Sequence, residues 1–321
     1  MPARIGILST AHMHAFGYAQ GLRTHADASL VGVWDDDVAR GKSFAEKFDI
    51  QFFENKEDLL SIVDAVVITS ENKKHVENAR AAAAGAKPML CEKPLVTTEE
   101  EATEMTDIAA QVTVMTAFPC RFSPAYQRLK ARVEAGDIGR LLAIDATNHG
   151  ACPFGWFVES DKSGGGAMMD HTVHVADLLR DLLGENPNTV YAQTANRIHG
   201  QSWEDTAMLH LTYASGVFAA IDASWSRPAS YKTWGDVKMS VVGEKGVIEL
   251  DMFSQGFDYY PADGKHGLGS FGSDLDALLI ASFLRAIETG EPEVTADDGI
   301  QAARTAIHGY ESARAGQPVP F

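Results

Sequence analysis

The chain has 321 residues, of which 45% are hydrophobic and 22% charged, a composition typical of a globular protein with room for two domains. Acidic residues outnumber basic residues by 44 to 27, and the net charge of −17 disfavours binding to nucleic acid or to an anionic membrane surface. No run approaches the roughly 20 apolar residues of a membrane span, and no secretory leader is evident, so we expect a cytoplasmic protein.

The first third of the sequence alternates strand-like and helix-like segments. The expected strands are 5–8, 30–34, 52–53, 65–69, 89–91 and 112–117, and the expected helices are 14–24, 39–48, 58–62, 74–84 and 98–110. This alternation indicates right-handed crossovers and a parallel sheet that is covered on both faces. We therefore predict a doubly wound, Rossmann-type α/β domain over residues 1–120.

The rest of the chain, residues 121–321, has a different pattern. Strand-like segments cluster at 141–147, 189–196, 206–213, 217–224, 237–242 and 246–251, and helix-like segments lie at 124–135, 167–183, 274–288 and 296–314. Hairpin signals at 214–216 and 243–246 separate neighbouring strands. The pattern predicts an α+β domain with a mainly antiparallel sheet that has one open face. Because such a face needs cover, we expect a homodimer or a homotetramer.

The turn after the first strand is the expected phosphate-binding turn of a dinucleotide site. Such a turn usually reads G-x-G-x-x-G and leads into a helix N-terminus, which can hold phosphate. Here Ser9, Ala11 and His14 occupy the three glycine positions, so the motif is irregular. The cofactor-binding residues predicted in this turn are Ser9, Thr10, Ala11, His12 and Met13.

Asp35 stands at the end of the second predicted strand, where a carboxylate can accept hydrogen bonds from the adenosine ribose. The same charge would repel the 2′-phosphate of NADP, and no arginine lies between Asp35 and Arg40. We therefore expect NAD as the cofactor and NADP to be less favoured. The alternative is a solvated acidic turn, because Asp36 and Asp37 follow directly.

Three residues are candidates for the chemistry. Lys93 follows the fifth predicted strand, and ligands of open α/β sheets gather at the carboxyl ends of strands. Asp170 and His174 are four residues apart and so share one face of a helix that begins after the glycine run 164–166. A carboxylate that orients an imidazole makes a proton acceptor near neutral pH. His171 points about 100° away from that face and is a weaker candidate.

A metal site is a competing interpretation, because Asp170, His171, His174 and His210 are all of ligand type. None of them stands in a recognisable ligand spacing such as H-E-x-x-H, so we predict no metal.

The sequence resembles the Gfo/Idh/MocA family of oxidoreductases over nearly its whole length. The resemblance depends on Glu92-Lys93-Pro94, on Arg121-Phe122-Ser123-Pro124, and on the glycine run followed by Asp170-x-x-x-His174. It implies NAD(P)-dependent interconversion of a secondary alcohol and a ketone on a sugar, inositol or related polyol, by direct hydride transfer.

The family resemblance also implies roles for particular residues. His174 would take the substrate hydroxyl proton while Asp170 orients it, and Lys93 would bind the reacting oxygen. Further cofactor contacts are implied for Thr69, Ser70, Asn72, His75, Glu92 and Lys93. The implied substrate-binding residues are Lys93, Arg121, Trp156, Asp170 and His174. Other aromatic and polar residues that could shape a polyol pocket are Trp225, Arg227, Tyr231 and Trp234.

Two alternatives to a dehydrogenase stay open. One is a glycosidase or epimerase that oxidises its substrate transiently and retains its NAD. The other is a binding protein that senses NAD without catalysis, which the irregular phosphate-binding turn would suit. Net NADH formation with a sugar panel separates the first from a dehydrogenase, and NAD binding without turnover would indicate the second.

Overall fold

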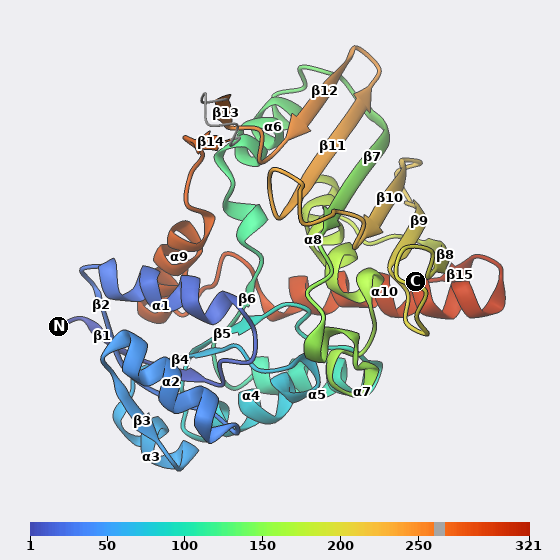
Figure 1. The fold of residues 1–321 in the computed structure, drawn as a ribbon. Helices are drawn as coiled ribbons and strands as arrows, with labels where there is room; N and C mark the ends of the chain where they lie inside the picture. The colour runs from blue at the N-terminus through green and yellow to red at the C-terminus, as the bar shows by residue number, and fades with distance from the viewer. Residues whose placement is uncertain (260–266) are drawn as a thin grey trace. The chain divides into compact units, whose positions relative to one another are not determined.

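A computed structural model describes residues 1–259 and 267–321, and the chain forms two compact units that interleave along the sequence (Figure 1). The first unit comprises Met1–Pro119, Trp156–Gly164 and Leu275–Arg304, and the second comprises Cys120–Gly155, Gly165–Asp274 and Thr305–Phe321. The sequence pattern instead predicted a single boundary, at residue 120. Among the described residues, no helix is long and apolar enough to cross a membrane.

The first unit contains a six-stranded sheet in the order β3-β2-β1-β4-β5-β6, with every neighbouring pair parallel. Its strands are β1 (Ala3–Leu8), β2 (Ala28–Trp34), β3 (Gln51–Phe53), β4 (Ala65–Ile68), β5 (Met89–Glu92) and β6 (Val114–Ala117). This order, with crossover helices between the strands, confirms the predicted doubly wound α/β fold.

The helices that accompany this sheet are α1 (His14–Thr24), α2 (Val38–Phe48), α3 (Lys56–Ile62), α4 (His75–Ala84), α5 (Glu99–Ala109), α7 (Ser160–Ser163) and α9 (Leu275–Thr289). Short 3₁₀ turns lie at η1 (Asn72–Lys74), η2 (Pro119–Phe122) and η3 (Gly155–Val158). Helix α9 packs against α1, as Figure 1 shows. A late segment of the chain therefore completes the first unit.

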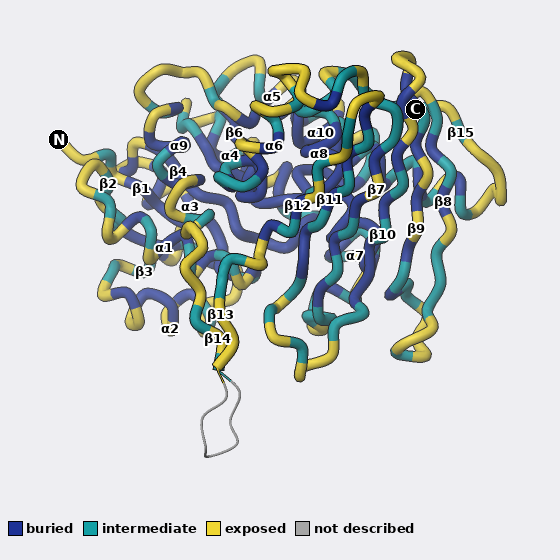
Figure 2. The backbone as a smooth tube through the Cα atoms, turned by 90° about the horizontal axis from the view of Figure 1, so that it is seen from above, coloured by how far each residue is buried: buried dark blue, intermediate teal, exposed yellow. Residues whose placement is uncertain are grey.

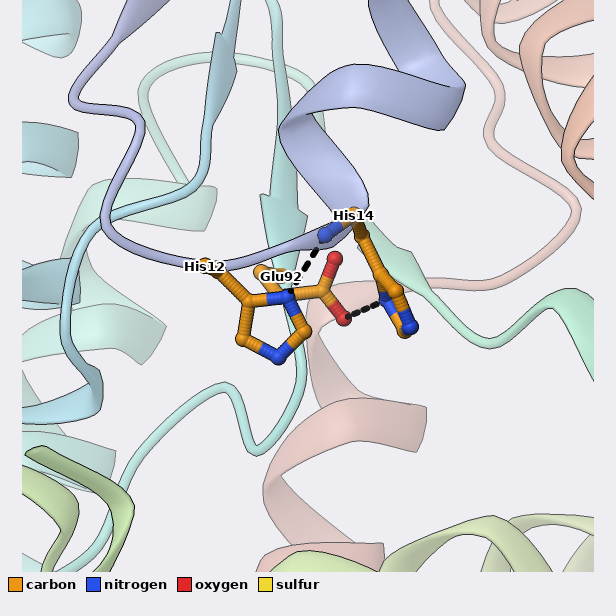
Figure 3. Close-up of side chains that lie close together, drawn as sticks. All are labelled: His12, His14 and Glu92. Carbon is orange, nitrogen blue, oxygen red and sulfur yellow. Dashed lines mark hydrogen bonds and ion pairs between the residues drawn. The ribbon is translucent and has the colours of Figure 1, made fainter. Parts of the chain in front are cut away.

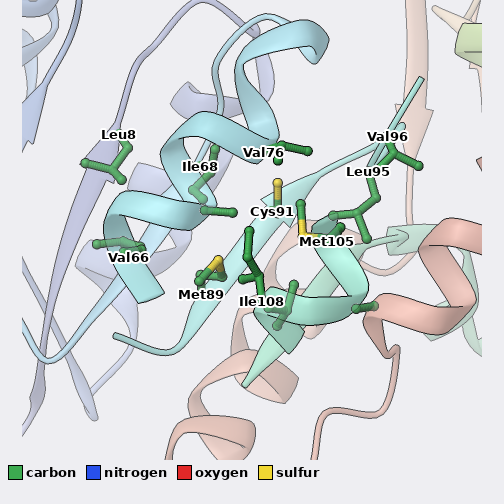
Figure 4. Close-up of a cluster of buried hydrophobic side chains, with 14 of the residues drawn as sticks. Leu8, Val66, Ile68, Val76, Met89, Cys91, Leu95, Val96, Met105 and Ile108 are labelled. Atoms are coloured by element: carbon green, nitrogen blue, oxygen red, sulfur yellow. The ribbon is translucent and has the colours of Figure 1, made fainter. Parts of the chain in front are cut away.

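The strands β4, β5 and β6 are buried at every residue, because helices cover both faces of the sheet. Figure 4 shows part of the resulting core, in which Met89 and Cys91 of β5 gather with Leu95, Met105 and Ile108. This packing fixes the carboxyl ends of the strands, where the candidate cofactor residues lie.

The second unit contains a seven-stranded sheet in the order β12-β11-β7-β10-β9-β8-β15. Its strands are β7 (Leu141–Gly150), β8 (Thr189–Ala195), β9 (Thr206–Thr212), β10 (Phe218–Ser224), β11 (Gly235–Gly243), β12 (Gly246–Asp251) and β15 (Val319–Pro320). Only the pairing of β10 with β7 is parallel, which confirms the mainly antiparallel sheet. The accompanying helices are α6 (Pro124–Glu134), α8 (Ala167–Leu183) and α10 (Ala296–Ala315), of which α10 runs through residues of both units.

One face of this sheet is covered by α8, which packs against β7, β9 and β10. In β9 the side chains of Ala207, Leu209 and Leu211 are buried, whereas Met208 and His210 between them are exposed. Figure 2 shows the same alternation of buried and exposed residues along β9. The other face is therefore open, as predicted.

Several short elements were not predicted. They are α7, the 3₁₀ turns, β15, and the exposed hairpin of β13 (Gly256–Tyr259) and β14 (Gly267–Ser270). Segments of two to four residues are too short to show a hydrophobic period, so only their tertiary contacts define them.

Candidate functional site

The predicted phosphate-binding turn, residues 9–13, connects β1 to α1 and is anchored to its neighbours by hydrogen bonds. Ser9 donates its N–H to the Trp34 carbonyl of β2 at 2.7 Å, and its own carbonyl accepts from Thr69 Oγ1 at 2.6 Å. His12 donates its N–H to the Thr69 carbonyl at 2.9 Å. Ser9 adopts a φ of 65°, the left-handed conformation that a glycine would take without strain. Hydrogen bonds from side chains and backbone therefore stabilise this turn, which contains no glycine.

Asp35 is buried, and both of its carboxylate oxygens are engaged within the first unit. Oδ2 accepts from the Thr10 N–H and Thr10 Oγ1, each at 2.7 Å, and from Arg40 Nε at 3.0 Å. Oδ1 accepts from Arg40 at 2.6 Å and from the Asp37 N–H at 2.9 Å. The sequence pattern gave Arg40 no role beside Asp35, whereas the first turn of α2 brings it onto this carboxylate. Asp35 therefore anchors the phosphate-binding turn, and any ribose contact shares its oxygens with these donors.

The basic side chains near Asp35 are all paired among the described residues. Arg40 also contacts Asp36 at 3.0 Å, and Lys74 is paired with Asp36 and, at 3.1 Å, with Glu71. Neither cation is left to receive a 2′-phosphate without first giving up a carboxylate.

The loop after β4 contains four predicted cofactor residues. Thr69 contacts the turn as described, and Asn72 Nδ2 donates to the Ser163 carbonyl at 2.8 Å. His75 is fully buried and its ring nitrogens lie 2.9 Å from the Pro94 carbonyl and 3.3 Å from the Ser70 carbonyl, so it supports the loop from within. Burial lowers the pKa of His75 below its ordinary value, although both carbonyls act in the opposite direction.

Two buried polar atoms in this loop test whether the residues fit a dinucleotide. Ser70 Oγ and Asn72 Oδ1 have no hydrogen-bond partner among the described residues. Buried polar atoms are nearly always bonded in folded proteins. The hydroxyl groups of a bound nicotinamide ribose could supply these missing partners, so the residues present fit the predicted cofactor.

Glu92, the last residue of β5, is fully buried between side chains from the start of α1 (Figure 3). Its carboxylate lies 3.2 Å from His14 Nδ1 and accepts from Tyr18 Oη at 2.7 Å. Burial alone would raise the pKa of Glu92, but the charges of His14, His12 and Lys93 hold it well below its ordinary range. Burial would conversely lower the pKa of His14, yet Glu92 raises it above the ordinary value. The carboxylate is therefore charged at neutral pH, and it favours the protonated form of His14.

Lys93 directly follows β5 and is buried, with 5% of its surface exposed. The Lys93–Pro94 peptide bond is cis, and the Pro94 carbonyl is bonded by His75. The lysine is thus set at the carboxyl end of the parallel sheet, the position that the sequence predicted. Its burial shows that Lys93 is not a solvated surface lysine.

Trp156 belongs to the first unit and lies beside the phosphate-binding turn, and its predicted role toward a substrate stays a prediction. Its indole Nε1 donates to the Ala11 carbonyl at 3.0 Å, and its ring stacks on Phe157 at 3.9 Å between centroids. Its ring also lies 6.0 Å from that of His12. This contact spans 145 positions in the sequence, so no local pattern could have indicated it.

Helix α8 of the second unit carries Asp170 and His174 one turn apart, both partly buried. Trp225 Nε1 donates to Asp170 Oδ2 at 3.0 Å, and His171 Nε2 lies 3.3 Å from the same oxygen. Trp225, named for a polyol pocket, is instead almost fully buried and holds this carboxylate.

The start of α8 explains the glycine run. A Cβ at Gly165 would meet Tyr310 Oη at 2.1 Å, and a Cβ at Gly166 would meet the Glu204 carbonyl at 2.4 Å. Glu204 Oε1 accepts from the N–H groups of Gly166 and Met168 at 2.7 and 3.3 Å, and Tyr310 donates to it as well. The glycines therefore permit close packing, and Glu204 caps the helix from a distant segment.

Arg121, a predicted substrate residue, has its guanidinium buried against α8. It contacts Asp177 with Nε at 2.9 Å and Asp181 with NH1 at 2.8 Å, and Tyr126 Oη donates to Asp181 at 2.6 Å. Two carboxylates neutralise this guanidinium, so the structure gives Arg121 a place in the packing of α6 and α8. Its role toward a substrate stays a prediction.

The sequence did not indicate the contacts of four residues with Asp35, Glu92 and Gly166, which span 5 to 144 positions: they are Arg40, Tyr18, Glu204 and Tyr310. The one local signal was His12-x-His14 in a turn that usually carries glycines.

Sequence comparisons agree with this geometry. A profile described as an oxidoreductase family with an NAD-binding Rossmann fold matches residues 4–118, and a GFO/IDH/MocA C-terminal domain profile matches residues 126–249. A 1,5-anhydro-D-fructose reductase of Ensifer adhaerens is 30% identical over 79% of each chain, and a myo-inositol 2-dehydrogenase of Thermotoga maritima is 28% identical over 93% of this chain and 92% of that one. The crystal structure of myo-inositol 2-dehydrogenase from Lactobacillus plantarum superposes with a TM-score of 0.85 over 100% of both chains, at 22% identity.

The fold and the profiles define an oxidoreductase with an NAD-binding Rossmann domain. The chain belongs to the Gfo/Idh/MocA family, as the resemblance of its motifs implied.

Proposed function

We propose that this protein is a dehydrogenase that interconverts a secondary alcohol and a ketone on a sugar, inositol or related polyol. The relatives named above act on inositol and on an anhydro sugar, according to their names, which supports this substrate class. The observation that carries the proposal is the placement of a buried Lys93 directly after β5 and of Asp170 and His174, both partly buried, one turn apart on α8.

We assign one task to each of these three residues. His174 accepts the proton of the substrate hydroxyl, because a neutral imidazole can act as a base near neutral pH. Asp170 orients that imidazole and stabilises its charged form, while Trp225 holds the carboxylate by its indole N–H. Lys93 donates to the reacting oxygen and stabilises the charge that develops on it. Bound NAD supplies the hydride acceptor.

We propose that NAD is preferred over NADP. The support is the charge around Asp35, where Arg40 and Lys74 are both engaged by carboxylates. The residues that would hold the cofactor are Ser9, Thr10, Ala11, His12, Met13, Asp35, Thr69, Ser70, Asn72, Glu92 and Lys93, with His75 behind the loop.

We also propose that the open face of the seven-stranded sheet forms the subunit interface of a homodimer or homotetramer. Phe218, Val247 and Met208 are 50%, 54% and 58% exposed on this face. Exposed apolar residues that share one face are typical of an interface. Met208→Asp combined with Phe218→Asp should lower the mass measured by light scattering, whereas Val38→Asp on α2, itself 49% exposed, should not.

The activity is tested by following net NADH formation with a panel of inositols, aldoses and anhydro sugars. We expect one class of polyol to give NADH, and we expect Lys93→Ala and His174→Ala to lose about 10²–10⁴-fold in kcat while retaining NAD affinity. The variants Lys42→Ala and His25→Ala, at exposed or partly exposed positions, serve as matched controls. Product without net NADH would indicate an NAD-retaining glycosidase or epimerase, and NAD binding without any turnover would indicate a sensor. Either result would contradict the proposed dehydrogenase activity.

A further inference from the structure

Two imidazoles and one carboxylate converge at the start of α1. His12 lies in the phosphate-binding turn, His14 is the first residue of α1, and Glu92 ends β5 (Figure 3). Each offers one ligand-type atom, and these atoms all lie within 4.8 Å of one another. We propose that His12, His14 and Glu92 bind a divalent transition-metal ion, with Zn²⁺ as the first candidate.

The donor set decides the chemical class of the ion. Two imidazole nitrogens with one carboxylate oxygen form a ligand set that suits Zn²⁺ and other late first-row metals, whereas Mg²⁺ and Ca²⁺ prefer oxygen ligands alone. In a tetrahedral zinc site with bonds of 2.0–2.2 Å, the ligand atoms lie about 3.4 Å apart. His14 Nδ1 and Glu92 Oε1 are already 3.2 Å apart, so mainly His12 has to move inward.

The neighbours of the cluster orient its ligands. Tyr18 Oη donates to Glu92 Oε2 at 2.7 Å, which leaves Oε1 directed toward His14. An outer partner such as Tyr18 fixes the orientation of a metal ligand and strengthens metal binding. His12 Nδ1 accepts from the His14 N–H at 3.2 Å, and this bond has to break before His12 binds the ion.

A buried ion pair between Glu92 and His14 is the simpler explanation, and it accounts for two of the three residues. His12 is buried beside this pair, 2% exposed, and its ring centroid lies 4.4 Å from that of His14 and 5.2 Å from that of Phe157. A shared ligand explains both imidazoles. The charge of Lys93 acts against a bound cation, and the carboxylate of Asp276 acts in its favour.

This site differs from the metal site that the sequence analysis considered and rejected, which drew on Asp170, His171, His174 and His210. The signal was present in the His-x-His spacing, but the third ligand is 78 positions away on another strand. Only the fold brings it within reach.

The test uses the full chain without an affinity tag, freed of metal by a chelator and titrated with Co²⁺. We expect one equivalent to bind with the visible absorption of a tetrahedral site, and stoichiometric Zn²⁺ to displace it. His12→Gln, His14→Gln and Glu92→Gln should each weaken Co²⁺ binding at least tenfold, and Tyr18→Phe should weaken it about tenfold. His25→Gln and His210→Gln, outside the cluster, should leave it unchanged.

The proposal is overturned if the wild-type chain binds no Co²⁺ or Zn²⁺ below about 10 μM, or if binding survives in all three ligand variants. Circular dichroism of each variant establishes that it is folded, and His14→Gln, the least buried position, is the variant least at risk of misfolding. Because metal affinity is measured without substrate or NAD, a failure to bind metal would not contradict the proposed dehydrogenase activity. Conversely, an inactive enzyme does not affect the metal titration.

Discussion

Helices α1 and α8 begin in different ways, although both must satisfy the N–H groups of a first turn. The turn into α1 lacks the usual glycines and is held by side chains, chiefly Asp35 and Thr10. The turn into α8 is made of glycines that pack against Tyr310 and the Glu204 backbone.

This difference has a physical consequence for substitution. A turn held by hydrogen bonds loses them one at a time, and each net bond contributes about 1 kcal/mol. A glycine turn packed against backbone atoms has no room for a methyl group. One added Cβ atom therefore displaces the neighbouring backbone and costs more than one lost hydrogen bond. The start of α8 should therefore tolerate change less than the start of α1, and four substitutions test this from the largest expected effect to the smallest.

Gly166→Ala should have the largest effect. Its Cβ would lie 2.4 Å from the Glu204 carbonyl oxygen, a backbone atom that cannot rotate away. We expect a loss of about 3 kcal/mol or more, measured as a fall in Tm. Gly85→Ala is the matched control, because its nearest contact is 3.4 Å away, and it should change stability by less than about 0.5 kcal/mol. If Gly166→Ala leaves Tm unchanged, the start of α8 is no less tolerant of substitution than the start of α1.

Glu204→Ala should follow. It removes the acceptor of two α8 N–H groups and of Tyr310, and we expect a loss of about 2–3 kcal/mol in thermal or urea unfolding. Tyr310→Phe retains both N–H bonds to Glu204 but removes the hydroxyl 3.1 Å from the Gly166 N–H, and it should lose about 1 kcal/mol. If Glu204 also positions the residues of α8, kcat should fall in Glu204→Ala at temperatures where the variant is fully folded. A wild-type kcat at those temperatures would show that Glu204 contributes to stability and not to catalysis.

Asp35→Asn tests the α1 side. The amide keeps the shape of the carboxylate but loses its charge toward Arg40, so we expect a loss of about 1–2 kcal/mol in unfolding free energy. The kcat/KM ratio of NADP to NAD should rise, because a charge that repels the 2′-phosphate is gone. Asp27→Asn, an exposed change, is the control for both measurements. If the ratio of kcat/KM for NADP to that for NAD does not change, Asp35 stabilises the phosphate-binding turn and does not select the cofactor.

Ser9→Gly should have the smallest effect on the unfolding free energy, and it should stabilise the protein where the other substitutions destabilise it. Ser9 has a φ of 65°, and relief of this conformation should stabilise the chain by about 0.5–1 kcal/mol. Asp49→Gly, at a φ of 53° after α2, is the comparison without a nearby cofactor residue. If Asp49→Gly stabilises and Ser9→Gly destabilises, the 3.4 Å contacts of Ser9 Oγ with Arg40 and the Ala11 N–H outweigh the strain.

The local pattern of the sequence determined most of the elements and both sheet types. Helices α1 and α8 have the bounds that their apolar spacing predicted, and the glycine at 184, with a φ of 70°, ends α8 as a C-cap. Hydrophobic period and capping act over a few residues, so they can be read without the fold. The positions of Lys93, Asp170 and His174 relative to their strand and helix could be predicted in the same way.

Only the tertiary structure decided which partners hold these residues. Trp156 reaches Ala11 across 145 positions, Arg121 reaches Asp177 across 56, and Glu204 caps a helix that begins 37 positions before it. The interleaving of the two units likewise depends on α9 packing on α1. Such contacts depend on shape and burial summed over distant segments, and no local period encodes them. The same reason applies to Glu92, which becomes a candidate metal ligand only because β5 ends beside the start of α1.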